Sequence, residues 1–167
     1  MNCPNDRYVN DAAIYQAVAA HLARIGIKVS LQTETKTIYF PRLLRRETSF
    51  YLFGWQVATV DSHDAIATLM ATPNDKGQGQ YNVGRYSNPK VDELSAKIQS
   101  EIDDTKRNQM IREAFKIHQD DVGHIPLHQQ ALAWGFRKQV SLTQLPNNWM
   151  IFKWVTIAPF SSVAAAR

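Results

Sequence analysis

The sequence predicts an α/β fold in which a layered sheet is flanked by helices. Residues 49–55 form a nearly continuous apolar run, which is typical of a strand covered on both faces, as in a parallel sheet between helices. Near Gly26 a helical pattern passes almost directly into a strand pattern, and such tight connections are typical of layered α/β packing. Together these two patterns indicate a buried sheet with helices packed on it.

Length and composition are those of an ordinary globular domain. The chain has 167 residues, of which 44% are hydrophobic, and this is enough for one domain with a proper core. No apolar run approaches the roughly 18 residues of a membrane-spanning helix, and the first residues lack the apolar segment of a secretion signal. Cys3 is the only cysteine, which excludes an internal disulfide and a cysteine-ligated metal cluster.

The first part of the chain is expected to form two helices joined by a strand. Asn10 or Asp11 can cap the first helix, since apolar residues recur at helical spacing after them. Residues 27–33 alternate between apolar and polar, which predicts a strand with one solvated face. Residues 35–47 suit a second helix, in which Pro41 is tolerated only if it lies in the first turn.

Three further helices are expected after the apolar run, and each follows a residue whose side chain can accept a hydrogen bond from an unpaired helix amide. These capping positions are Asp61 or Ser62, Asn88 with Pro89 behind it, and Asp103 or Asp104. Residues 73–80 lack apolar side chains and predict an exposed loop. Residues 124–128, 131–136 and 149–157 are expected to be extended segments.

The junction at Trp55 is the leading candidate for a functional site. Ligands of open α/β sheets bind beyond the carboxyl ends of the strands, and Trp55 ends the apolar run just before a polar loop. An indole at such a place can line a pocket and still form a hydrogen bond through its nitrogen. A place in the core is an equal alternative for this ring.

Two clusters of charged residues suggest other functions. Asp61, His63 and Asp64 are side chains that bind zinc or iron, and they would suit a metal-dependent hydrolase; the alternative is a helix cap with a surface histidine. Arg42, Arg45 and Arg46 would suit a basic α/β module that binds nucleic acid or phosphorylated partners. The alternative for the arginines is a solvated helix face, because the other basic residues are scattered.

Sequence motifs for catalysis are missing. The GxSxG motif of serine hydrolases and the phosphate-binding motifs GxxxxGK[ST] and GxGxxG do not occur. We therefore expect a protein that is not an enzyme and that needs no cofactor.

Several short motifs appear together in the order in which a known family has them. They are Asn2-Cys3-Pro4-Asn5-Asp6-Arg7-Tyr8, the helix end Ala23-Arg24-Ile25-Gly26-Ile27-Lys28-Val29, Gly54-Trp55, Tyr86-Ser87-Asn88-Pro89-Lys90-Val91-Asp92-Glu93-Leu94, Asp104-Thr105-Lys106-Arg107 and Ile125-Pro126-Leu127. With this set, residues 2–158 resemble the carboxy-terminal lobe of the family 5 extracellular solute-binding proteins of bacterial ABC transporters. That family includes dipeptide-, oligopeptide- and nickel-binding proteins.

The resemblance implies a type II periplasmic-binding-protein lobe. Residues 1–158 would be the carboxy-terminal solute-binding lobe of a longer two-lobe protein, and residues 159–167 would be a disordered tail. The lobes of such proteins close around a solute, and the membrane permease recognises the closed form. The resemblance thus implies a periplasmic protein that binds an oligopeptide or a similar polar solute, has the ABC transporter permease subunits as partners, and does not bind nucleic acid.

The resemblance also implies a set of ligand-binding residues: Trp55, Gln56, Ala58, Thr59 and Asp61. Peptide-binding relatives have an aspartate three residues after the tryptophan, where it pairs with the amino terminus of the ligand; here that residue is Ala58, which offers no carboxylate. In nickel-binding relatives the tryptophan and the residue four positions later face the ligand, and these correspond to Trp55 and Thr59. Gln56 and Asp61 would add polar contacts beside the indole.

Overall fold

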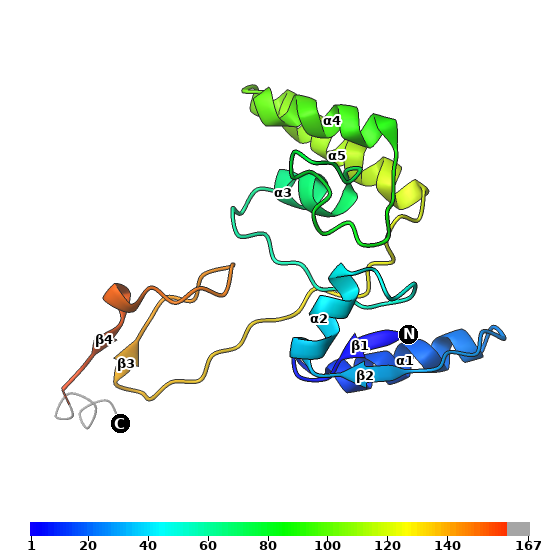
Figure 1. Ribbon diagram of the computed structural model, residues 1–167. Helices are drawn as coiled ribbons and strands as arrows, with labels where there is room; N and C mark the ends of the chain where they lie inside the picture. The colour runs from blue at the N-terminus through cyan, green and yellow to red at the C-terminus, as the bar shows by residue number, and fades with distance from the viewer. Residues whose placement is uncertain (160–167) are drawn as a thin grey trace. The chain divides into compact units, whose positions relative to one another are not determined.

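The computed structural model describes residues 1–159 (Figure 1). The chain divides into two compact units, one spanning Met1–Pro126 and the other beginning at Leu127, whereas the sequence pattern suggests one domain. Most of the tail predicted for residues 159–167 lies outside the described residues. Among the described residues, no helix is both long and apolar enough to span a bilayer.

A small parallel sheet lies at the amino-terminal end of the first unit. Strand β1 (Asn2–Pro4) pairs with β2 (Gln32–Glu34), with Asn2 opposite Gln32. On the other edge of β1, Tyr51 forms a single parallel bridge to Asn2. Strand β2 is shorter than the strand predicted for residues 27–33 and begins near its end.

The prediction of a long buried strand at residues 49–55 is therefore wrong, because the strand is reduced to one bridge. The predicted parallel pairing is correct. Only Tyr51 takes part in the sheet: the Asn2 amide donates to the Phe50 carbonyl at 2.9 Å, and the Leu52 amide donates to the Asn2 carbonyl at 3.3 Å. The physical reason is the length of the neighbour, since β1 offers only three residues for pairing. Phe50 is 39% exposed, so the segment is not covered on both faces.

Helix α1 (Asp11–Ala23) is present as predicted. The Asn10 side chain forms no capping hydrogen bond. Asp11, the first residue of the helix, accepts a hydrogen bond from the Ala12 amide at 2.8 Å and others from the amides of Arg7 and Tyr8, which precede the helix, at 3.1 and 3.3 Å. The fully buried side chain of this helix is Tyr15.

Helix α2 (Lys36–Leu44) also lies where it was predicted, but Pro41 is in its interior and not in the first turn. Proline there removes one helical hydrogen bond and strains the preceding turn. Tertiary packing offsets this cost, because Tyr39 and Leu43 are completely buried and the Tyr39 hydroxyl donates to the Leu52 carbonyl at 2.7 Å.

The main helical core of the first unit combines four helical segments. Helix α3 (His63–Ala65) continues into the π-helical turn η1 (Ile66–Met70), and α4 (Pro89–Ser100) packs against α5 (Asp104–Asp120) (Figure 1). Their buried side chains form one cluster, made up of Ile66, Met70, Val91, Leu94, Ile98, Ile111 and Ala114. The caps predicted at Asn88 and Asp103 are confirmed, since each accepts a hydrogen bond from an amide in the first turn at 2.9 Å. Before α3, Ser62 makes no capping hydrogen bond, and the His63 amide donates to Asp61 at 3.0 Å.

The second unit has little regular structure. Strand β3 (Val140–Ser141) pairs antiparallel with β4 (Thr156–Ile157), and a 3-10 turn, η2 (Phe152–Trp154), precedes β4. The strand predicted for residues 149–157 is therefore reduced to its last part, and residues 124–128 and 131–136 form no strand. The side chains of Trp149 and Phe152 are 61% and 78% exposed, so among the described residues no facing sheet covers the apolar positions of this segment.

Candidate functional site

The Gly-Trp step at residues 54–55 is fixed by a close approach to Tyr8. The Gly54 amide donates a hydrogen bond to the Tyr8 hydroxyl at 2.8 Å. A Cβ atom on residue 54 would lie 2.6 Å from Cε1 of Tyr8, so only glycine fits without a shift of the tyrosine ring. Glycine at this position lets the chain pass over Tyr8 and present the indole of Trp55 immediately afterwards.

Trp55 lies at the end of a row of aromatic rings and is half-buried. Its ring centroid is 4.9 Å from that of Tyr81 and 5.9 Å from that of Phe53, and Phe53 in turn lies 6.2 Å from Phe40. The indole Nε1 donates to the Asp64 carboxylate at 2.9 Å. These contacts, together with a half-exposed ring, give a rigid apolar surface of the kind that lines ligand sites.

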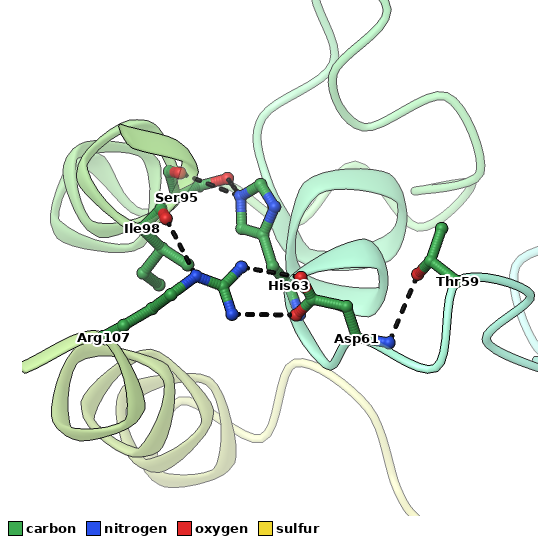
Figure 2. Close-up of polar contacts among 6 residues, drawn as sticks. All are labelled: Thr59, Asp61, His63, Ser95, Ile98 and Arg107. Atoms are coloured by element: carbon green, nitrogen blue, oxygen red, sulfur yellow. Dashed lines mark hydrogen bonds and ion pairs between the residues drawn. The ribbon is translucent and has the colours of Figure 1, made fainter. Parts of the chain in front are cut away.

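Asp61 is held by an ion pair with Arg107 of α5 (Figure 2). The guanidinium group donates to both carboxylate oxygens, at 2.7 and 3.2 Å, and the backbone amide of His63 donates to the same carboxylate at 3.0 Å. The hydrogen bonds from Arg107 lower the pKa of Asp61, and that from the His63 amide adds to the effect. The carboxylate is therefore ionised, and the positive charge of Arg107 balances its negative charge.

The remaining predicted ligand residues lie on the exposed stretch between Trp55 and Asp61. Gln56, Ala58 and Thr59 are all exposed, and the Thr59 hydroxyl oxygen accepts a hydrogen bond from the Asp61 amide at 3.3 Å. Trp55 and the Asp61–Arg107 pair thus hold the two ends of a short exposed loop.

The three side chains considered for a metal site do not converge. Asp61 binds Arg107, Asp64 binds the Trp55 indole, and His63 Nε2 lies 2.9 Å from the backbone carbonyl of Ser95 (Figure 2). Within residues 1–159, no group of three or more histidine, cysteine, aspartate or glutamate side chains is placed to hold a metal ion. These contacts tie the loop to its neighbours. The alternative, a helix cap with a surface histidine, does not match them either, because His63 is half-buried against Ser95.

The arginine cluster after Pro41 is also largely neutralised. Arg42 forms ion pairs with Glu34 and, at 3.4 Å, with Glu47, and Arg45 pairs with Glu47 at 2.6 Å. The first cause of the lowered pKa of Glu47 is its hydrogen bond from Arg45. Two of the three charges expected for a nucleic-acid surface therefore have partners within the chain.

The sequence did not predict a cavity that lies beside His63. A cavity of about 450 Å³ is lined by His63 of α3, by loop residues 74 and 76–78, and by Ala67 and Gln99. The polar loop at residues 73–80 was the signal in the sequence, but a loop alone does not show what it covers.

The sequence matches no protein-family model, and it matches no curated protein. Its fold, however, matches many solved structures. The pheromone receptor PrgZ, described with its mode of peptide binding, aligns with 95% of the chain at 20% identity and a TM-score of 0.76. The chain has a periplasmic-binding-protein fold.

Two further solved structures support this assignment. DppA from Helicobacter pylori, an ABC transporter-associated periplasmic binding protein in complex with the peptide STSA, aligns with 95% of the chain at 20% identity and a TM-score of 0.74. HbpA2 from Haemophilus parasuis aligns with 95% at 22% identity and a TM-score of 0.68. The predicted α/β class, that of a type II periplasmic-binding-protein lobe, is thereby confirmed.

The chain spans about a third of the length of these binding proteins, from 30% to 32%. At identities of 20% to 22% the match establishes the fold. The fold does not identify a ligand, so any inference about the ligand has to rest on the residues around Trp55.

Proposed function

We propose that the chain forms part of the substrate-binding component of an ABC importer, which binds an oligopeptide or a similar polar solute in a cleft between two lobes. Its partners would be the permease subunits, and its location the periplasm. The fold that it shares with DppA and PrgZ supports this proposal. The observation that carries it is the half-exposed indole of Trp55, held at the edge of an aromatic row next to an exposed loop.

Within this proposal each predicted residue has a definite role. Trp55 supplies a flat apolar surface for a side chain or the backbone of the solute, and Gln56 and Thr59 supply polar contacts. Asp61 offers a carboxylate that is already shared with Arg107, so its attraction for a ligand cation is weaker than that of an unpaired carboxylate. Ala58 leaves the free amino terminus of a peptide without a charged partner at this position.

Closure of the two lobes would be the functional event. A solute that contacts both lobes binds the closed form more tightly than the open form, and so shifts the population toward the closed form. The loop between Trp55 and Asp61 suits one wall of such a cleft, because both of its ends are fixed while its middle is exposed.

The test is calorimetry with a panel of tri- to pentapeptides on a polypeptide that contains this chain and a second lobe. Trp55→Ala should weaken binding of the tightest peptide at least about tenfold, as is typical when a buried aromatic contact is removed. Trp149→Ala, at an exposed tryptophan of the second unit, is the matched control and should leave the affinity unchanged. Equal affinity of the Trp55→Ala variant and the wild type would remove the indole from the site.

A further inference from the structure

A second and smaller cavity has a positively charged lining. It measures about 260 Å³ and is lined by Arg46, Thr72, Pro73 and Arg85. These residues come from three segments of the first unit: the end of α2, the chain after η1, and the loop before α4. The cavity is smaller than the roughly 300–1,000 Å³ of pockets that hold drug-sized molecules, so its size suits a small ligand.

Both arginines of this cavity lack a partner within the described part of the chain. The neighbouring Arg42 and Arg45 are paired with glutamates, but Arg46 has no ion pair or side-chain hydrogen bond among residues 1–159, and neither has Arg85. Two guanidinium groups that line one small cavity repel each other unless an anion lies between them. Arg46 is thus the member of the sequence cluster that remains available for a ligand.

The Thr72 of this lining is held by a carboxylate. Asp92 accepts hydrogen bonds from the Thr72 amide at 2.7 Å and from the Thr72 hydroxyl at 2.6 Å. This arrangement fixes Thr72 in the lining and uses both oxygens of the carboxylate. Among the described residues, no ion pair joins Asp92 to Arg46 or Arg85.

The backbone holds both arginines in a conformation that ordinarily selects glycine. Arg46 has φ 61° and follows the last turn of α2, where its amide bonds to the Leu43 carbonyl and the Glu47 amide bonds to the Arg42 carbonyl. This is the Schellman arrangement, whose left-handed residue is usually glycine. An arginine there is strained relative to glycine.

Arg85 has φ 56° and lies in a loop that is closed by a buried side chain. The Asn82 side chain accepts from the Tyr86 amide at 3.0 Å and donates to the Tyr86 carbonyl at 2.7 Å. Asn82 is only 1% exposed, so the loop around Arg85 is anchored in the core. The backbone of Arg85 is therefore fixed, and its side chain is exposed.

We propose that Arg46 and Arg85 form a binding site for a small oxyanion, either a phosphate or a carboxylate. A planar guanidinium group matches the spacing of two oxygens on either anion and can donate two parallel hydrogen bonds to them. Two such groups, both exposed and lining a cavity of small volume, favour one compact anion over a large ligand. The site does not include Trp55 and does not depend on the proposed transport function.

The first experiment measures binding of inorganic phosphate to the 167-residue chain, by phosphorus NMR titration at low ionic strength, where screening is weak. The variants are Arg46→Gly and Arg85→Gly, because glycine suits the positive φ at both positions and should preserve the fold. Each should weaken phosphate binding at least about tenfold, as expected when a charge-assisted hydrogen bond is lost. Arg112→Ala removes an exposed charge on α5 and should bind like the wild type.

Three results would overturn the proposal: no saturable binding by the wild type, unchanged binding by both glycine variants, or an equal loss in Arg112→Ala.

A competition experiment then distinguishes the two possible anions, phosphate and carboxylate. An acetylated dipeptide acid that displaces phosphate, while its amide does not, would identify a carboxylate as the ligand, and failure of the acid to displace would identify phosphate. Equal displacement by the acid and the amide would show that charge is not recognised, which also contradicts the proposal.

Discussion

The guanidinium group of Arg107 holds the Asp61 carboxylate through two hydrogen bonds, at 2.7 and 3.2 Å. The two residues are 46 positions apart, so this ion pair fastens the loop before α3 to the start of α5. Arg107 also donates from Nε to the Ile98 carbonyl at 3.2 Å, near the end of α4. One side chain therefore joins three segments of the first unit.

Arg107→Ala should lower the free energy of unfolding by about 1–2 kcal/mol. The bidentate geometry and the contact with Ile98 favour a measurable effect, while partial exposure of Asp61 to solvent keeps it modest. Urea unfolding of the first unit checks this value, with Arg112→Ala on the same helix as the control. An equal loss in both variants would assign the effect to helix α5 and not to the ion pair.

The same ion pair predicts how stability depends on pH. Because the pKa of Asp61 is lowered in the folded chain, the pair contributes stability above the ordinary aspartate pKa of about 3.9, and this contribution is lost as the pH falls through the folded value. The difference in unfolding free energy between the wild type and Arg107→Ala should therefore be present at pH 7 and shrink below about pH 4. A difference that is the same at pH 7 and pH 2.5 would exclude the charge of Asp61 as its cause.

His118 in the last turn of α5 and His124 just after this helix predict a second effect of pH on stability. His118 is 4% exposed, and its Nε2 lies 2.7 Å from Nδ1 of His124. Burial, and next the neighbouring His124, lower the pKa of His118 to about 4, although Asp121 acts in the opposite direction. The ring of Tyr86 packs against His118 at 4.5 Å, and its hydroxyl donates to Asp121.

A buried neutral histidine contributes stability above its unfolded pKa of about 6.5, and this is lost as the pH falls toward its folded value. Stability should therefore decline from about pH 6.5 toward pH 4, and His118→Phe should reduce this decline. Thermal unfolding over this pH range measures it, with His21→Ala on the exposed side of α1 as the control. The idea fails if the slope with pH is the same in His118→Phe and the wild type.

Gly54→Ala should destabilise the chain by about 1–3 kcal/mol, the range expected when a close-packed position receives an extra methyl group. The new Cβ would lie 2.6 Å from Cε1 of the Tyr8 ring, and the hydroxyl of the same residue accepts the hydrogen bond from the Gly54 amide. Gly135→Ala is the matched control, because a Cβ there meets nothing within 4 Å. Chemical unfolding should show the loss for Gly54→Ala alone, and tryptophan fluorescence should report displacement of the neighbouring Trp55.

Arg46→Gly should leave stability unchanged or raise it by up to about 1 kcal/mol, because glycine relieves the positive φ but adds freedom to the unfolded chain. Arg45→Gly, one residue earlier with φ −76°, is the control and should lower stability by about 0.5–1 kcal/mol. Differential scanning calorimetry of both variants makes the comparison. A larger loss for Arg46→Gly than for Arg45→Gly would mean that the Arg46 side chain stabilises the fold itself.

Features that depend on neighbouring residues could be predicted from the sequence. The starts of α4 and α5 follow from Asn88, Pro89 and Asp103, because a capping side chain bonds to an amide two or three residues away. The placement of Trp55 before an exposed loop also follows from the order of apolar and polar residues. The resemblance to solute-binding proteins rests on motifs of this local kind, and the chain has the periplasmic-binding-protein fold that this resemblance implies.

The tertiary structure decided every feature that depends on a distant partner. The run at residues 49–55 has the composition of a buried strand, yet only Tyr51 joins the sheet, because pairing requires a neighbour of equal length and β1 has three residues. The sequence likewise presented Asp61 and Arg46 as charged residues in a loop and a helix, without showing that one is bound by Arg107 and the other lines a cavity with Arg85. A side chain's charge is a local property, whereas its neutralisation depends on which residue folding brings within about 3 Å.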